Sequence, residues 1–251
     1  MRQRLLALAL LTTLAAGCGG EPVPTTTAEG PSASTPTPRT PTPSTPTVAP
    51  PSPAAAIRLP PDAPTVFTGT VVAGELPVAR LVPPGATVGS TWVLQPPDDA
   101  IAQVGVVWSR GADPLSSEHG LEIWRPAPPG WRVAFAFTDP AGAGVFGIRA
   151  ETADLTGDGI PDLLTFEDTG GSGGCGTWRV IASEPAGPTQ ILRRSTCDTQ
   201  IQPEGGDLKV RAAVFAPGDS HCCPSAFRTT TLRWNGSAWT VVDRVVTPAS
   251  G

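Results

Sequence analysis

Proline and glycine are spread so densely through this chain that long helices are excluded from most of it. The 251 residues include 31 prolines and 28 glycines. No stretch of ten residues in 61–251 shows a convincing apolar period of 3.6. Both residue types weaken a helix interior, and proline also removes a backbone donor. The core must therefore be built mainly from short strands.

Alternating apolar residues predict strands throughout residues 61–251. Between Trp131 and Phe137, large apolar side chains alternate with smaller or polar ones, a period of two that is typical of a strand with one buried face. Runs rich in β-branched and aromatic residues predict further strands at 66–72, 88–94, 101–108 and 208–215.

Three pairs of such runs are separated by turn residues and predict hairpins. The pairs are 121–124 with 131–135, 178–181 with 190–192, and 232–234 with 239–242. In the last pair the turn contains Asn235-Gly236, the strongest short hairpin signal. We therefore expect an all-β fold of antiparallel sheets built from hairpins, arranged as a sandwich or a partial propeller.

The first 17 residues have the pattern of a signal peptide. Arg2 and Arg4 give a positive start, and residues 5–16 form an apolar run of 12 residues, too short to span a bilayer. The run closes on 14–18, Leu-Ala-Ala-Gly-Cys, which resembles a bacterial lipobox. The resemblance implies that cleavage precedes Cys18, that its thiol takes a diacylglyceryl group, and that the new α-amine is acylated, with palmitate expected.

Lipidation of Cys18 would place the protein at a membrane. One acyl chain binds a membrane only marginally, whereas two or three chains anchor stably. We therefore expect the protein on the outer face of the cell membrane, where the lipid anchor makes the membrane its partner. The alternative is an ordinary secretory signal, with Cys18 paired to another cysteine.

Residues 18–60 are predicted to be a disordered linker that begins with the lipidated cysteine. Between 19 and 53, 24 of 35 positions are Pro, Thr or Ser. Such a segment buries too little apolar surface to offset the entropy of ordering. Its repeated Thr-Pro pairs favour an extended polyproline II spacer. Residues 61–251 then form the extracytoplasmic all-β domain.

Four cysteines lie in that domain, and an even number in an exported protein predicts two disulfides. We favour a bond between Cys175 and Cys197, which closes a loop across a predicted strand pair. A strained bridge between Cys222 and Cys223 would complete the set, and two crossed links are the alternative. A soft-metal site with His221 is a weaker interpretation, because adjacent thiolates chelate poorly.

One segment carries the spacing of a calcium loop. Counted from Asp154, side-chain oxygens fall at positions 1, 3, 5 and 9, and a backbone carbonyl falls at position 7. Ca²⁺ prefers six to eight such hard oxygens. The predicted ligands are Asp154, Thr156, Asp158, Ile160 (through its carbonyl) and Asp162. We therefore expect Ca²⁺ as a cofactor.

The run 153–163 resembles the calcium loop of FG-GAP and VCBS-type repeats. In those repeats the loop joins two strands of a propeller blade, and the resemblance implies the same five ligands here. The segment departs from an EF-hand because Thr165 stands at position 12 and predicted strands flank it at 145–148 and 163–166. An acidic turn satisfied by water and backbone amides is the alternative.

The remaining motifs give no catalytic assignment. Residues 170–174 match G-x-S-x-G, but the predicted strand after them is incompatible with a nucleophile elbow, so we expect a glycine loop. His119 lies in a polar run and is expected at the surface. Cys-Cys-Pro at 222–224, followed by an aromatic hairpin, resembles exported actinobacterial proteins of uncharacterised activity.

Charge and motifs together favour a binding protein over an enzyme. The net charge is −5 and Lys209 is the sole lysine, so no basic patch exists for nucleic acid. The tryptophans are expected to fill the core, with an exposed sugar-binding platform as the alternative. We expect a non-catalytic module that binds envelope polysaccharide or a protein ligand. The alternative is a hydrolase of envelope polysaccharide with a carboxylate pair.

Overall fold

The computed structural model describes residues 57–69, 77–94 and 103–249. The signal peptide, Cys18 and the linker up to residue 56 lie outside these described residues, as do parts of the strands expected at 66–72 and 101–108. No helix in the described ranges is long and apolar enough to cross a membrane.

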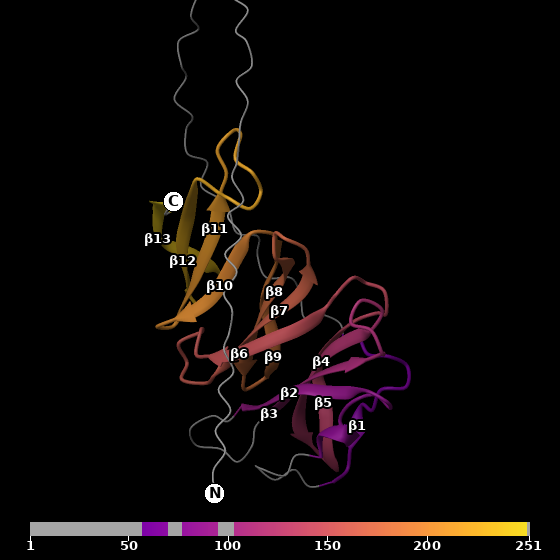
Figure 1. The fold of residues 1–251 in the computed structure, drawn as a ribbon. Coiled ribbons are helices and arrows are strands. Elements are labelled where there is room, and N and C mark those ends of the chain that lie inside the picture. Colours follow the sequence, from indigo (N-terminus) through magenta and orange to yellow (C-terminus); the bar gives the residue numbers. More distant parts are fainter. Residues whose placement is uncertain (1–56, 70–76, 95–102, 250–251) are drawn as a thin grey trace, which may run out of the picture. The chain divides into compact units, whose positions relative to one another are not determined.

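The described residues form three antiparallel sheets, shown in Figure 1. The first sheet has the order β1-β5-β4-β3-β2. Its strands are β1 (Val66–Phe67), β2 (Thr87–Leu94), β3 (Gln103–Arg110), β4 (Glu118–Ala127) and β5 (Gly130–Asp139), and the 3₁₀ turn η1 (Val78–Arg80) precedes β2. The expected all-β fold is therefore confirmed.

The second and third sheets are four-stranded meanders in which each strand pairs with its neighbour in sequence. The second contains β6 (Gly147–Ala153), β7 (Asp162–Gly170), β8 (Cys175–Glu184) and β9 (Gly187–Thr196). The third contains β10 (Thr199–Glu204), β11 (Asp207–Val214), β12 (Ala226–Trp234) and β13 (Trp239–Pro248). The three predicted hairpins are confirmed as β4–β5, β8–β9 and β12–β13.

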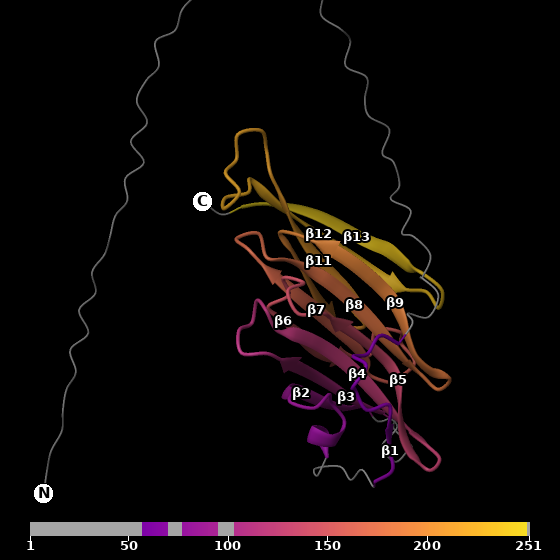
Figure 2. The ribbon, with the colours of Figure 1, turned by 90° about the vertical axis from the view of Figure 1, so that its right-hand side faces the viewer.

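The sheets stack face to face, as Figure 2 shows, and apolar side chains fill the spaces between them. Between the first and second sheets, Leu121 and Phe135 pack against Leu163 and Ile181. Between the second and third, the core contains Leu164 and Val180 together with apolar residues of β10 to β13. Because side chains alternate between the two faces of each strand, the second sheet contributes to a core on both of its faces.

A third cluster covers the outer face of the first sheet. Trp108 and Trp124 are fully buried there, and Leu81 and Val82, just after η1, pack against them. Four of the seven tryptophans are buried, namely Trp108, Trp124, Trp131 and Trp239. The expectation that tryptophans mainly fill the core is confirmed for these four.

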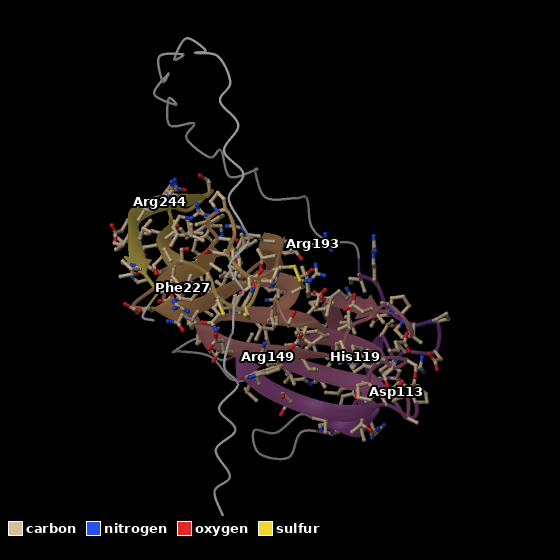
Figure 3. All side chains as sticks on the ribbon, turned by 45° about the horizontal axis from the view of Figure 1, so that its top comes forward. Asp113, His119, Arg149, Arg193, Phe227 and Arg244 are labelled. Carbon is tan, nitrogen blue, oxygen red and sulfur yellow. A yellow bond between two sulfur atoms is a disulfide. The ribbon has the colours of Figure 1, made fainter. Side chains whose placement is uncertain are left out.

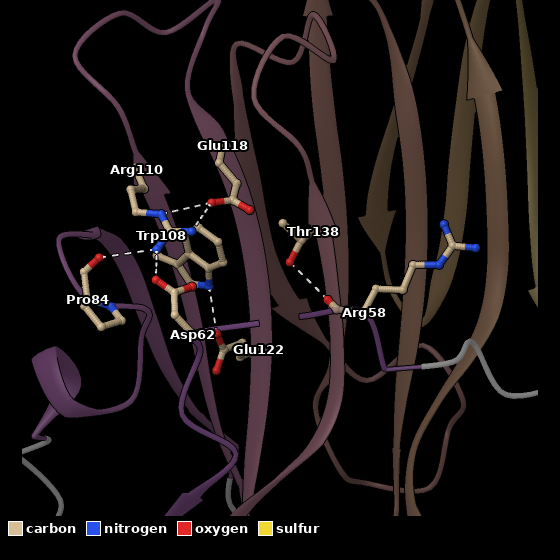
Figure 4. Close-up of polar contacts among 8 residues, drawn as sticks. All are labelled: Arg58, Asp62, Pro84, Trp108, Arg110, Glu118, Glu122 and Thr138. Atoms are coloured by element: carbon tan, nitrogen blue, oxygen red, sulfur yellow. Dashed lines mark hydrogen bonds and ion pairs between the residues drawn. The ribbon is translucent and has the colours of Figure 1, made fainter. Parts of the chain in front are cut away.

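This cluster contains a fully buried carboxyl group, that of Glu122 on β4. The indole nitrogens of Trp108 and Trp124 donate to its two oxygens over 3.0 and 3.1 Å; Figure 4 shows the Trp108 bond. Desolvation raises the pKa of Glu122 to about 8, although the two indole bonds oppose that rise. The carboxyl is therefore mainly protonated at neutral pH.

Candidate functional site

A groove with a volume of about 700 Å³ runs along the second and third sheets. Its walls come from β6, β7, β8, β10, β11 and β12, from the β7–β8 turn and from the connection between β11 and β12. Arg149 of β6 and Phe227 of β12, both labelled in Figure 3, lie in this lining. A groove of this size is in the range of small-molecule and oligomer sites.

Aromatic rings and guanidinium groups alternate across the groove. The guanidinium carbon of Arg149 lies 4.8 Å from the centre of the Phe166 ring, which in turn lies 4.4 Å from the ring of Trp178. On the third sheet, the guanidinium of Arg211 lies 3.4 Å from the centre of the Phe227 ring. Cation–π contacts of this kind hold both arginines against the wall.

The second-sheet part of this array follows from strand register. Arg149 pairs with Phe166, and Phe166 pairs with Trp178, so the three side chains share one face. The indole nitrogen of Trp178 is buried and has no hydrogen-bond partner among the described residues. A buried donor without a partner costs stability, and Trp178 therefore contributes its ring to the groove wall while its nitrogen stays enclosed.

One end of the groove is fixed by the disulfide between Cys175 and Cys197. This bond confirms the favoured pairing and excludes the crossed links. Asp198, next to it, has a positive φ of 51°, and its amide donates to the carbonyl of Gly173. The imidazole nitrogen Nε2 of His221 lies 3.3 Å from the carboxylate of Asp198. The His221 ring also stacks on Phe215, with 5.5 Å between ring centres.

The other two cysteines are thiols in the structure. The sulfur atoms of Cys222 and Cys223 lie 2.8 Å apart, and both residues are exposed. Hydrogen bonds from Cys223 and from Ser220 lower the pKa of the Cys222 thiol. The second disulfide stays a prediction, and the groove contains Cys222 in its lining.

The predicted calcium loop connects β6 to β7 away from the groove residues. Asp154 accepts hydrogen bonds from the amides of Gly157 and Gly159, over 2.7 and 3.0 Å. Asp158 accepts one from the amide of Ile160 over 2.8 Å. Both glycines have positive φ, which fits the tight turn that the sequence indicated.

Asp162 occupies a different environment from the other loop carboxylates. It is fully buried, and one oxygen accepts from the amides of Leu155 and Thr156 and from the Thr156 hydroxyl. Its second oxygen accepts from the amide of Ser183 on β8. Burial raises the pKa of Asp162, and these bonds oppose that rise.

The loop residues suit a hard cation in their chemistry. The oxygens of Asp154 and Asp158 accept at most one amide bond each, which leaves acceptor positions for a metal ligand bond. One oxygen of Asp162, in contrast, already accepts three bonds. Within the described ranges, however, no three His, Cys, Asp or Glu side chains converge as a metal cluster. Four of the five expected ligands lie in the β6–β7 loop, Asp162 is the first residue of β7, and Ca²⁺ there stays a prediction.

Two other sequence expectations have clear outcomes. Residues 170–174 form the turn between β7 and β8, so a strand follows Ser172 as expected for a glycine loop. His119 was expected at the surface, and this is wrong: it is only 5% exposed. Strand β4 begins at Glu118, so His119 lies in the sheet, with Nε2 3.3 Å from the Pro114 carbonyl.

Comparison of the chain with protein families, curated proteins and solved structures found no match. The groove therefore has to be interpreted from its own chemistry. Sequence reasoning missed it, because its residues come from strands that are far apart in the chain. The one usable signal was on β6, where the exposed Arg149 follows the buried Ile148. Phe166 on β7 is itself buried between buried neighbours, so its strand gave no such signal.

Proposed function

We propose that the protein is an exported lipoprotein, held at the outer face of the cell membrane through Cys18, whose β domain binds envelope polysaccharide without cleaving it. The observation that carries the binding function is the groove of about 700 Å³ with its aromatic and charged lining. The proposed anchor rests on the lipobox-like residues 14–18.

Polysaccharide is the ligand class that fits this lining best. Sugar rings have apolar faces that pack on aromatic rings, and hydroxyl edges that need polar partners. Phe215 is 38% exposed and offers a ring face, while Gln200 and Gln202 line the same groove with amides. Arg149, Arg211 and the nearby carboxylates give the groove charges of both signs, which suit a neutral as well as a charged sugar chain.

Calorimetry tests this proposal with soluble polysaccharide released from isolated cell envelopes. Phe215→Ala should weaken binding roughly three- to tenfold, equivalent to about 0.5–1.5 kcal/mol of aromatic contact. Phe146→Ala is the matched control, because Phe146 is 44% exposed but does not line the groove. No heat of binding with the wild type, or equal losses in both variants, would reject the groove as the site.

One observation favours the hydrolase alternative. Glu151 lines the groove, and partial burial raises the pKa of its carboxyl, as a general acid requires. Asp168 lies in the same lining, but it pairs with Gly147, four residues along β6 from Glu151, and its carboxylate lies 3.7 Å from Arg149 Nη2. The same titrations decide between the two functions: release of new reducing ends by the wild type, lost in Glu151→Gln, would replace binding by hydrolysis.

A further inference from the structure

Two arginines face each other on the first sheet. Arg125 of β4 and Arg132 of β5 are directly opposed partners in the antiparallel register, so their side chains leave the same face. Like charges in this position destabilise a sheet. Among the described residues, neither arginine forms an ion pair. Their charges therefore lack a counter-ion within the described part of the chain.

Both arginines line a pocket with a volume of about 490 Å³, separate from the groove. The turn of the β8–β9 hairpin forms its other wall, with Gly187 and Thr189. Arg125 Nη2 donates to the carbonyl of Pro185 over 2.8 Å, which ties its guanidinium to that wall. The Thr189 hydroxyl donates over 3.5 Å to the carboxylate of Glu184, which forms no ion pair with Arg125 or Arg132.

The glycine at this turn keeps the guanidinium close. A Cβ atom added to Gly187 would lie 3.3 Å from Arg125 Nη1, and Gly187 has a φ of 141°. A larger residue would therefore crowd the arginine. The fixed Arg125 and the exposed Arg132 therefore present two guanidinium groups to one space.

We propose that this pocket binds a phosphate-type oxyanion, either as the free ion or as the phosphodiester of a larger molecule. Two guanidinium groups can each donate two parallel hydrogen bonds to such a group. The bound charge would also remove the repulsion between Arg125 and Arg132. This site is independent of the polysaccharide groove, because the two share no lining residue.

Calorimetry with the mature full-length protein and inorganic phosphate tests the proposal. Arg132→Gln is the informative variant, because Arg132 is exposed and no side-chain hydrogen bond of it is seen. Losing one charge-assisted partner should weaken phosphate binding about tenfold or more. Arg244→Gln, an exposed arginine of β13 outside the pocket, is the control and should bind as the wild type does.

A second arm separates the sources of the anion. Glycerophosphoglycerol carries the phosphodiester of a lipid headgroup without its acyl chains. If only inorganic phosphate binds, the ligand is the free ion. If glycerophosphoglycerol binds as well, the ligand is the phosphodiester of a headgroup or polymer. Equal affinities of the wild type and Arg132→Gln for phosphate, or no binding by either at matched ionic strength, would overturn the proposal.

Discussion

At the residue scale, the carboxyl of Glu122 makes the fold sensitive to pH. Its folded pKa is about 8, against an ordinary value of 4.5. A carboxyl with a raised folded pKa contributes stability that is complete below about 4.5 and is lost as the pH rises through 8. The free energy of unfolding should therefore fall between pH 5 and 8, by up to about 1.4 kcal/mol per unit from this group.

Glu122→Gln should reduce the fall of the unfolding free energy with pH, obtained from urea unfolding curves measured from pH 5 to 8. An amide stays neutral but accepts only one of the two indole bonds, so the variant should also lose about 1 kcal/mol at low pH. Glu204→Gln, at an exposed site, should keep the wild-type slope. An unchanged slope in Glu122→Gln would show that this carboxyl is ionised in the folded protein.

The neighbouring thiols give a second prediction at this scale. Because Cys222 and Cys223 have sulfur atoms 2.8 Å apart at an exposed turn, oxidation should join them in the mature exported protein. Peptide mapping without reduction should then find no free thiol among the four domain cysteines. Two alkylatable thiols at 222 and 223 would contradict the predicted bridge and leave Cys175–Cys197 as the sole disulfide of the domain.

At the element scale, the β6–β7 loop should respond to calcium. Its carboxylates repel one another without a cation, and a ligand that binds only the folded state stabilises it by mass action. At about 100 times Kd this is about 2.7 kcal/mol, a rise in Tm of roughly 5–10 °C for a domain of this size. Mg²⁺ should raise the Tm less, because it demands a stricter geometry.

Asp158→Ala should abolish the calcium response in thermal unfolding. Asp158 is exposed and accepts a single amide bond, so this variant should fold. Asp243→Ala, an exposed aspartate on β13, is the matched control and should respond as the wild type does. Identical melting curves in calcium and in chelator would mean that the amide bonds alone satisfy the loop.

Strands and turns were predictable from the sequence because their signals are local. The alternation from Trp131 to Phe137 predicted β5, and Asn235-Gly236 predicted the turn between β12 and β13. The position of β6 was not predictable to the residue: it begins at Gly147 and continues to Ala153, beyond the expected 145–148. Local pattern could not show this, because pairing with β7 up to Asp162 extends the strand.

At the scale of the whole molecule, the signal residues should decide where the protein resides. Cys18→Ser removes the thiol that the lipobox resemblance implicates, so the precursor should stay uncut and lack its lipid. Partition between detergent and aqueous phases measures this, and the variant should move to the aqueous phase. A serine variant that partitions like the wild type would contradict the proposed anchor.

Sites formed across sheets were beyond the reach of the sequence. The groove joins residues of β6 with others of β11, and the arginine pocket joins β5 with the β8–β9 turn. Neither site follows from a residue spacing along the chain, because the stacking of the sheets brings the residues of each site together. The calcium loop could be predicted from the sequence because its five expected ligands lie within nine consecutive residues, and it stays a prediction.

The order of strands has a consequence for how the chain reaches its fold. In the second and third sheets every strand pairs with its sequence neighbour. Each of these sheets can therefore close through short loops, whose entropic cost is small. Among the described strands, only the β1–β5 pair must wait for distant residues to meet. The chain can thus assemble in order as it is synthesised, which limits the time during which unpaired strand edges could aggregate.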